Sequence, residues 1–238
     1  MKTRRSIVTL LAAGVLRQVL LVLLGTSLIQ TLLFLSIGMN RAVILHDAFR
    51  YGWTAVIAGT GFVLMSIVLS KNGCETSSQI GLTLKRLTIS EELIFWIQAS
   101  FNAVVYALFW FTQIITAYLL AKYYVSTLDA SMVTRQTIFL AFYRSSYLHS
   151  ILPLDAVIHW IRNIVLLGAL GAANAAFSYI TRRGRTTIWI YVLILAVIIF
   201  FVRGPGDLAS DLILMGASMV CGLLSIWQMK RQEVLNDY

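Results

Sequence analysis

Residues 93–121, LIFWIQASFNAVVYALFWFTQIITAYLLA, decide the fold class of this chain. The stretch contains no charged residue, and it is longer than the roughly 17 to 25 residues that an α-helix needs to cross a bilayer core of about 30 Å. Further apolar runs lie on both sides of it, separated by short segments that hold most of the charge. The six predicted spans are 19–38, 53–70, 93–121, 163–181, 186–202 and 212–229.

The composition agrees with a membrane protein. Hydrophobic residues make up 59% of the 238 residues and charged residues only 12%. The runs lack the apolar and polar alternation of a transmembrane barrel, and lipid cannot satisfy free backbone donors and acceptors. We therefore expect an all-α polytopic integral membrane bundle of six transmembrane helices, formed by a single domain over residues 1–238.

Residues 1–18 resemble the start of a secretory signal. Lys2, Arg4 and Arg5 precede the short apolar run 7–16, but Arg17 follows at once and a full-length span begins after it. This pattern favours an amphipathic N-terminal helix that is retained and lies on the inner leaflet. A cleaved signal remains the alternative.

The positions of the cations predict the orientation. Twelve of the 19 Lys and Arg residues fall on the side that holds both termini, and the tight basic clusters all lie there. Cytoplasmic segments carry such an excess, so we expect both termini in the cytoplasm. The net charge of +9 then reflects membrane insertion and contact with anionic lipid, and a nucleic-acid partner is not expected.

The predicted cytoplasmic loop 71–92 has an amphipathic pattern. Ile80, Leu84 and Leu87 fall at i, i+4 and i+7, which places them on one face of a short helix. Thr88 and Glu91 have the spacing of a capping box, so a new helix is expected to start here and to run into the third span. The apolar face of this helix could be the surface on which a cytoplasmic ATPase acts. The alternative is an interfacial helix that only lies on lipid.

The layout resembles the small permease subunits of ABC-2-type ATP-binding cassette exporters. The resemblance covers the whole chain and is carried by the basic N-terminal helix, the six spans, the loop segment 83–90 (TLKRLTIS) and the Gly-Pro-Gly break at 204–206. The segment 142–154 (FYRSSYLHSILPL) is also similar to membrane proteins of Gram-positive bacteria that accompany peptide-antibiotic resistance ATPases. The outer connection 122–162 is longer than in those permeases.

The resemblance implies a bacterial plasma membrane protein that assembles with cytoplasmic ABC ATPase subunits and with a second permease copy or a related chain. It also implies two sets of functional residues. The residues implied in ATPase coupling are Ile80, Leu82, Leu84, Lys85, Arg86, Leu87, Ile89 and Glu91. The residues implied in an outer re-entrant segment are Gly204, Pro205, Gly206, Asp207 and Asp211.

Several catalytic motifs are missing from the sequence. It has no phosphate loop, and its one Gly-Thr-Gly, Gly59 to Gly61, lies in a span without a lysine. We therefore expect no cofactor in this chain, with ATP and Mg²⁺ bound by the partner ATPase. Neither His-Glu-x-x-His nor Gly-x-Ser-x-Gly is present, so an intramembrane enzyme is only a third hypothesis.

Polar residues inside the spans are the candidates for a substrate path. In the third span they recur with Phe109 at intervals of three or four residues, which keeps them on one helical face, and this face should meet protein or water. The alternative is that they form hydrogen bonds between helices. The candidate path residues are Gln30, Gln98, Asn102, Tyr106, Gln113, Asn163 and Asn174.

Metal and disulfide sites are not predicted. Asp155 and His159 lie at i, i+4, and His46 precedes Asp47, but two ligands make a poor metal site. Asp207 and Asp211 lie at i, i+4 at the start of the last helix, where they are expected to cap the helix; ion or substrate binding is the alternative. Cys74 and Cys221 fall in a loop and in a span, which does not suit a disulfide.

The sequence therefore predicts a permease subunit that moves an amphiphilic compound, such as a peptide or a lipid-like molecule. The alternative is a membrane scaffold or sensor that binds a cytoplasmic partner without transport.

Overall fold

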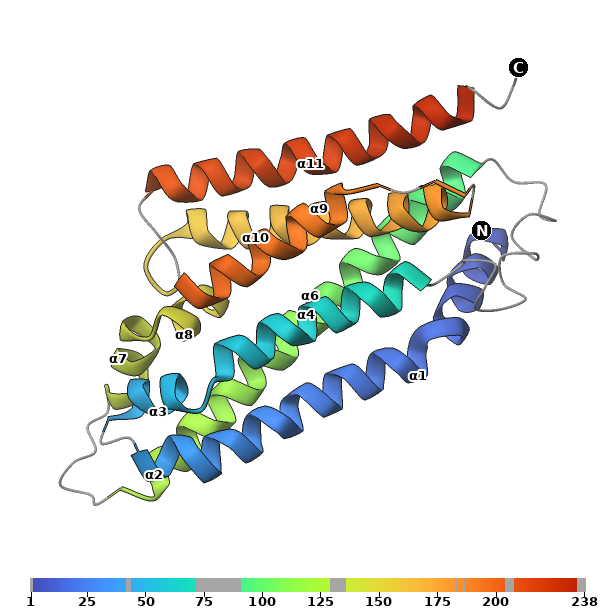
Figure 1. Ribbon diagram of the computed structural model, residues 1–238. Helices are drawn as coiled ribbons and strands as arrows, with labels where there is room; N and C mark the ends of the chain where they lie inside the picture. Colours follow the sequence, from blue (N-terminus) through green and yellow to red (C-terminus); the bar gives the residue numbers. More distant parts are fainter. Residues whose placement is uncertain are drawn as a thin grey trace.

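The computed structural model describes residues 2–41, 44–71, 91–128, 136–182, 184–185, 187–203 and 208–234. Every regular element in these ranges is helical, as the sequence predicted. Figure 1 shows the long helices side by side in one bundle. The elements are α1 (Lys2–Leu33), η1 (Phe34–Gly38), α2 (Met39–Arg41), α3 (Leu45–Tyr51), α4 (Thr54–Lys71), α6 (Glu91–Ser126), α7 (Thr137–Arg144), α8 (Ser146–Ile151), α9 (Val157–Thr181), α10 (Trp189–Arg203) and α11 (Leu208–Val234).

Five segments are long and apolar enough to cross a membrane. They are Leu11–Gly38, Thr54–Lys71, Glu92–Ser126, Val157–Thr181 and Leu208–Arg231. The predicted span at 186–202 corresponds to α10, which has 15 residues and is therefore about 22 Å long, shorter than a bilayer core of about 30 Å. The chain is thus a helical, multi-pass membrane protein by length and composition, and the predicted count of six spans is not confirmed.

The N-terminal helix is continuous with the first span. The helix α1 runs without a break from Lys2 to Leu33 and continues through the π-helical turn η1. Leu11 and Val15 in its first half are already buried. A separate interfacial helix over 1–18 is therefore not confirmed.

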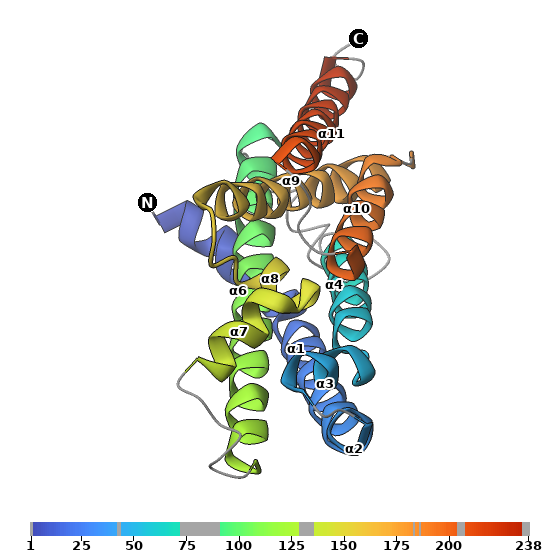
Figure 2. The ribbon, with the colours of Figure 1, turned by 90° about the vertical axis from the view of Figure 1, so that its left-hand side faces the viewer.

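The helices α6 and α9 form the core of the bundle, with α11 packed on α9, α1 packed on α6, and α4 packed on α1 and α10. Figure 2 looks along the bundle and shows α9 crossing α6 at a steep angle. At this crossing a Cβ atom on Gly171 would lie 2.8 Å from the backbone oxygen of Ala99 and from the nitrogen of Ala103. The two helices can approach this closely because residue 171 has no side chain.

Short helices gather at one end of the bundle. In Figure 1 the elements α2, α3, α7 and α8 lie at the end opposite both chain termini. The segment expected as a long outer connection therefore contains α7 and α8. The Phe34 and Phe49 rings, 4.8 Å apart between centroids, pack η1 against α3. The first turns of α9 and α11 begin at the same end, where α9 contacts α8 through Asn163 and α11 contacts α9 through Asp211.

Candidate functional site

A stripe of buried side chains runs along one face of α6. Each member has a relative exposure of 0%, although four of the five are polar: Gln98, Asn102, Tyr106, Phe109 and Gln113. The predicted burial of this face is confirmed. Its use as a substrate path stays a prediction.

Tyr106 joins three helices through its hydroxyl group. The hydroxyl lies 2.6 Å from the Ser66 hydroxyl on α4 and accepts a hydrogen bond of 2.7 Å from the Asn174 side-chain amide on α9. Ser70, also on α4, donates to the Asn174 amide oxygen at 2.7 Å. These contacts form one buried network between α4, α6 and α9.

A second network lies nearer the end with the short helices. The Gln30 side-chain amide on α1 donates to the Gln113 amide oxygen at 2.6 Å and to the Thr54 carbonyl at 3.1 Å. The Tyr147 hydroxyl on α8 donates to the same Gln113 oxygen at 3.2 Å. Burial raises the pKa of the Tyr147 phenol, so it remains a donor at neutral pH. Gln113 thereby connects α6 with α1 and α8.

The remaining path candidates differ in their partners. The Gln98 amide oxygen accepts from Arg182 at 3.5 Å. Neither side-chain amide atom of Asn102 has a hydrogen-bond partner among the described residues, although the residue is fully buried. Asn102 is therefore a buried member of the stripe whose side-chain donor and acceptor are unsatisfied among the described residues.

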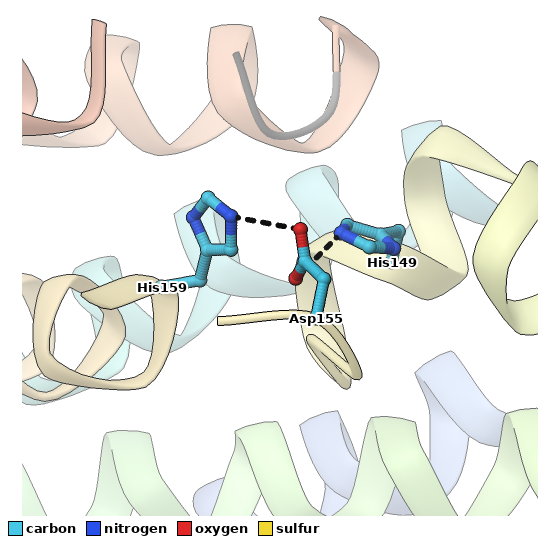
Figure 3. A group of neighbouring side chains, drawn as sticks. All are labelled: His149, Asp155 and His159. Carbon is cyan, nitrogen blue, oxygen red and sulfur yellow. Dashed lines mark hydrogen bonds and ion pairs between the residues drawn. The ribbon is translucent and has the colours of Figure 1, made fainter. Parts of the chain in front are cut away.

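Two histidines meet one carboxylate where α8 approaches the start of α9 (Figure 3). The His149 Nε2 atom lies 3.1 Å from Asp155 Oδ1, and the His159 Nε2 atom lies 3.2 Å from Asp155 Oδ2. Both imidazoles are buried, whereas the Asp155 side chain is 37% exposed. Pro153 and Leu154 lie between the two helices, and this non-helical connection directs Asp155 toward both rings.

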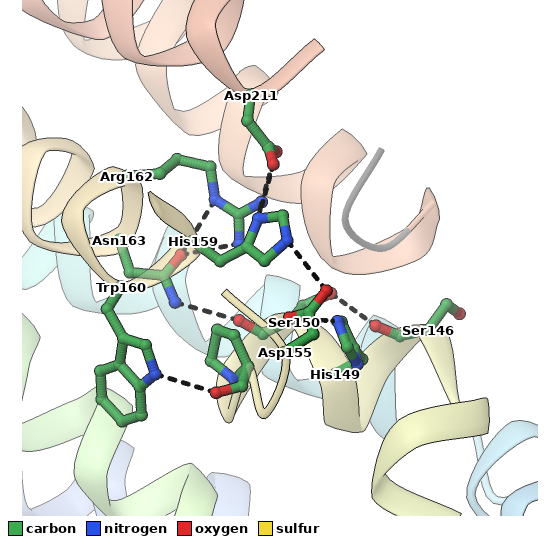
Figure 4. A network of polar contacts seen from close by, with 10 residues as sticks. Ser146, His149, Ser150, Asp155, His159, Trp160, Arg162, Asn163 and Asp211 are labelled. Carbon is green, nitrogen blue, oxygen red and sulfur yellow. Dashed lines mark hydrogen bonds and ion pairs between the residues drawn. The ribbon is translucent and has the colours of Figure 1, made fainter. Parts of the chain in front are cut away.

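Two further charged side chains extend this cluster into the bundle (Figure 4). The Arg162 guanidinium, with a relative exposure of 0%, pairs with Asp211 Oδ1 at 2.5 Å. The second oxygen of Asp211 faces His159 Nδ1 at 2.5 Å. Asp211 is in the first turn of α11, near the start of the last helix, where the sequence placed it. Its described contacts, however, tie α11 to α9.

Asn163 completes the inner part of this cluster. Its amide oxygen accepts from the Arg162 guanidinium at 3.2 Å, and its amide nitrogen donates to the Ser150 carbonyl at 3.1 Å. These contacts hold Arg162 in place and link α9 to α8. Asn163, a predicted path residue, is thus occupied by a structural contact.

Local interactions favour the ionised form of Asp155. Partial burial acts to raise the pKa of the carboxyl group, but the backbone amides of Asp155 and Ala156 and the attraction of the two histidines outweigh it. The pKa of Asp155 therefore lies below its ordinary value. A carboxylate with two imidazole nitrogens beside it is a donor set that divalent metals use.

The other histidine and aspartate pair does not join this cluster. His46 lies 3.8 Å from Asp47 on α3, and both residues line a cavity of about 520 Å³ together with Arg50, Trp53 and Arg144. Among the described residues, His149, Asp155 and His159 form a group of three potential metal ligands.

Most of the implied coupling and re-entrant residues lie outside the described residues. They are Ile80, Leu82, Leu84, Lys85, Arg86, Leu87, Ile89, Gly204, Pro205, Gly206 and Asp207. Glu91 is the first residue of α6, where the sequence predicted the start of a new helix. Asp211 is described and lies in the cluster above.

Sequence reasoning identified only part of the cluster. The i, i+4 spacing of Asp155 and His159 was visible, but His149 was not recognised as their third neighbour. A second histidine ten positions before His159, with a proline between them, was a usable signal. Nothing in the sequence indicated that Asp211 would reach Arg162 and His159.

No protein-family model matches this chain, and neither the curated proteins nor the solved structures contain a significant match to it.

Proposed function

We propose that this chain is the permease subunit of an ABC-2-like exporter that moves an amphiphilic substrate, such as a peptide or a lipid-like compound. A separate cytoplasmic ATPase would supply the energy. In this proposal the segment 71–92 is the point of contact with the ATPase, and both termini lie on the same side of the bacterial plasma membrane as that segment.

The observation that carries the proposal is the position of α6. The helix has 36 residues, so it is about 54 Å long and exceeds the roughly 40 to 45 Å of a whole bilayer with its headgroups. It begins at Glu91, at the end of the segment 71–92. A force applied there would act on one long helix.

The hydrogen bonds of α6 extend to most of the other long helices. Its side chains bond to Gln30 of α1, to Ser66 of α4 and to Asn174 of α9. A displacement of α6 would therefore move or break contacts in several helices at once. This arrangement supports a coupling role for the helix.

A groove between α1 and α6 supports an amphiphilic substrate. The groove has a volume of about 800 Å³ and is mostly apolar, with the hydroxyl groups of Ser27, Thr31 and Thr116 in its wall. Leu24, Leu28 and Leu119 in its lining are mostly exposed, so the groove is open toward the surroundings of the bundle. A chain-like molecule with few polar groups suits such a surface better than an ion or a sugar does.

Co-purification tests the proposal. The tagged chain, extracted in mild detergent from its own host, is expected to bring an ATPase subunit with it. Leu84→Asp is expected to remove that subunit, because a charge is placed in the middle of the predicted apolar stripe. The matched control is Ser78→Asp, which adds the same charge on the opposite face of the predicted loop helix and is expected to leave the complex intact.

The outcomes separate the hypotheses. An ATPase that stays bound to the Leu84→Asp variant contradicts the coupling assignment. A captured partner without ATPase activity supports the alternative, a scaffold or sensor that binds a cytoplasmic protein without transport. Both variants must elute as monodisperse membrane protein, so that loss of the partner is not a consequence of misfolding.

A further inference from the structure

We propose that His149, Asp155 and His159 bind one zinc ion at the end of the bundle opposite the chain termini. The three potential ligand atoms lie within 4.8 Å of one another. The His149 and His159 Nε2 atoms lie 3.1 and 3.2 Å from the two different oxygens of Asp155, and the ligand atoms of a tetrahedral zinc ion with bonds of about 2.0 to 2.1 Å are roughly 3.3 Å apart. Small side-chain adjustments would bring all three onto one ion (Figure 3).

The two ring nitrogens of His159 have different neighbours. Its Nε2 faces Asp155, whereas its Nδ1 lies beside both Asp211 and the Arg162 guanidinium, whose Nη1 is 3.3 Å away. A neutral imidazole has only one N–H. With that N–H on Nδ1, directed at Asp211, Nε2 presents its lone pair to the space between His149 and Asp155, where a metal ion would bind.

The charge balance of the cluster points the same way. With both histidines neutral, Asp155 and Asp211 contribute two negative charges and Arg162 contributes one positive charge. The five side chains thus have an excess of one negative charge next to buried groups. A divalent cation at His149, Asp155 and His159 would offset this excess.

The surroundings of His159 match those of a metal-ligating histidine. Such a histidine usually offers its second ring nitrogen to a carboxylate, which fixes the tautomer and the ring orientation. Asp211 supplies that carboxylate at Nδ1, and the buried Arg162 holds Asp211 in position. The Nε2 atom of His159 then carries the free lone pair, which points toward Asp155 and the space beside His149 (Figure 4).

The ligand set selects the class of metal. Two imidazoles and one carboxylate suit zinc, whereas calcium and magnesium prefer oxygen ligands. Asp155 is 37% exposed on its side chain, so the ion can enter from solvent. Three protein ligands leave a fourth position for water, which is the pattern of open zinc sites.

Zinc titration of the full-length chain tests the proposal. The protein is purified in detergent without a polyhistidine tag, treated with a chelator, and titrated with zinc chloride in a calorimeter. We expect one zinc ion per chain. His149→Ala, Asp155→Ala and His159→Ala should each weaken binding at least about 100-fold, and Asp211→Asn should weaken it about 10- to 100-fold because the second ring nitrogen loses its partner.

The third histidine of the chain provides the matched control. His46→Ala removes a histidine at the same end of the bundle, and it should leave both the stoichiometry and the affinity unchanged. Cobalt(II) replaces zinc as a second probe, and the bound ion should show the visible absorption of a tetrahedral site in the wild type and lose it in the His149→Ala variant. This readout remains available if the buried His159→Ala variant fails to fold.

Two results would overturn the proposal. One is a wild-type chain that binds no stoichiometric zinc. The other is a His149→Ala variant that binds zinc as tightly as the wild type. Neither result bears on the ATPase, because zinc binding is measured on the isolated chain.

Discussion

Tyr106 is the side chain at which α4, α6 and α9 share hydrogen bonds. Its hydroxyl contacts Ser66 and accepts from Asn174, and its ring lies 6.1 Å from that of Phe62, nearly parallel to it. In lipid a hydrogen bond between helices contributes about 1 kcal/mol or less. The two bonds matter because their loss would leave buried polar groups without partners.

Tyr106→Phe is expected to destabilise the protein by about 1 kcal/mol, since the Asn174 amide and the Ser66 hydroxyl lose a shared partner while the ring stays in place. Thermal unfolding in detergent, followed by fluorescence, measures the change. Tyr118→Phe removes the same atom from an exposed position on the same helix and should have no effect. Equal melting temperatures for both variants would contradict a stabilising role for the Tyr106 network.

The spacing of the residues in α6 predicted which of them are buried, but it could not predict their partners. Residues three or four positions apart share a helical face, so the burial of Gln98 to Gln113 follows from sequence alone. Ser66 and Asn174 are 40 and 68 positions from Tyr106. Such pairings depend on how the helices cross, and the sequence pattern of one helix does not contain that information.

The same limit applies to the histidine cluster. Asp155 and His159 are neighbours on adjacent turns, and their proximity was predictable. Asp211 reaches Arg162 across 49 positions, because α9 and α11 pack side by side. The ion pair also explains why the start of α9 was placed too late, at residue 163. A charged arginine in the sequence indicates the end of an apolar span. In the structure, however, Asp211 of α11 compensates the charge of Arg162, so α9 can include this residue.

At the level of the helices, the small residues of α9 set the distance to α6. Ala172, Ala173 and Ala175 are buried with Gly171 at the crossing, and Gly171 faces the backbone of α6 directly. Without a hydrophobic driving force between helices in lipid, close backbone packing is a main source of association. In this structure the close approach of α9 to α6 occurs at Gly171.

Gly171→Ala is expected to destabilise the protein by about 1 to 3 kcal/mol, because the added methyl group would meet rigid backbone atoms at 2.8 Å and the two helices would have to separate. Denaturation in a detergent series measures the loss. Gly168→Ala lies one turn earlier on α9, where a Cβ would meet nothing within 4 Å, so it should be neutral or slightly stabilising. A reversed order of the two variants would show that this crossing does not limit the packing.

At the level of the whole molecule, the two ends of the bundle differ in character. One end holds the chain termini and the ends of α4 and α9, with an exposed ion pair of 3.6 Å between Lys230 and Glu92. The other end holds the short helices and the buried cluster around Asp211. The apolar runs alone predicted a multi-pass helical protein, whereas the shortness of α10 could not be predicted from an apolar run whose first residues lie outside the helix.

The orientation of the molecule in the membrane is a prediction from its cations, and it can be tested with the chain's own cysteine. Cys74 lies in the segment 71–92, and Cys221 is buried. In intact cells a membrane-impermeant maleimide should leave Cys74 unlabelled and should label it after permeabilisation. Leu154→Cys, placed in a Cys74→Ser background at an exposed position beside the histidine cluster, should be labelled in intact cells, and Cys74→Ser alone gives the background.

Opposite accessibility of these two positions would place the segment 71–92 outside the cell and would contradict contact with a cytoplasmic ATPase. It would leave the zinc proposal intact, because His149, Asp155 and His159 would then face the cytoplasm with the same geometry. The expected pattern places the ATPase contact and the zinc ligands on opposite sides of the membrane. The long helix α6 would then be the element that connects the two ends, through Gln113 and Tyr147, which lies two residues before His149.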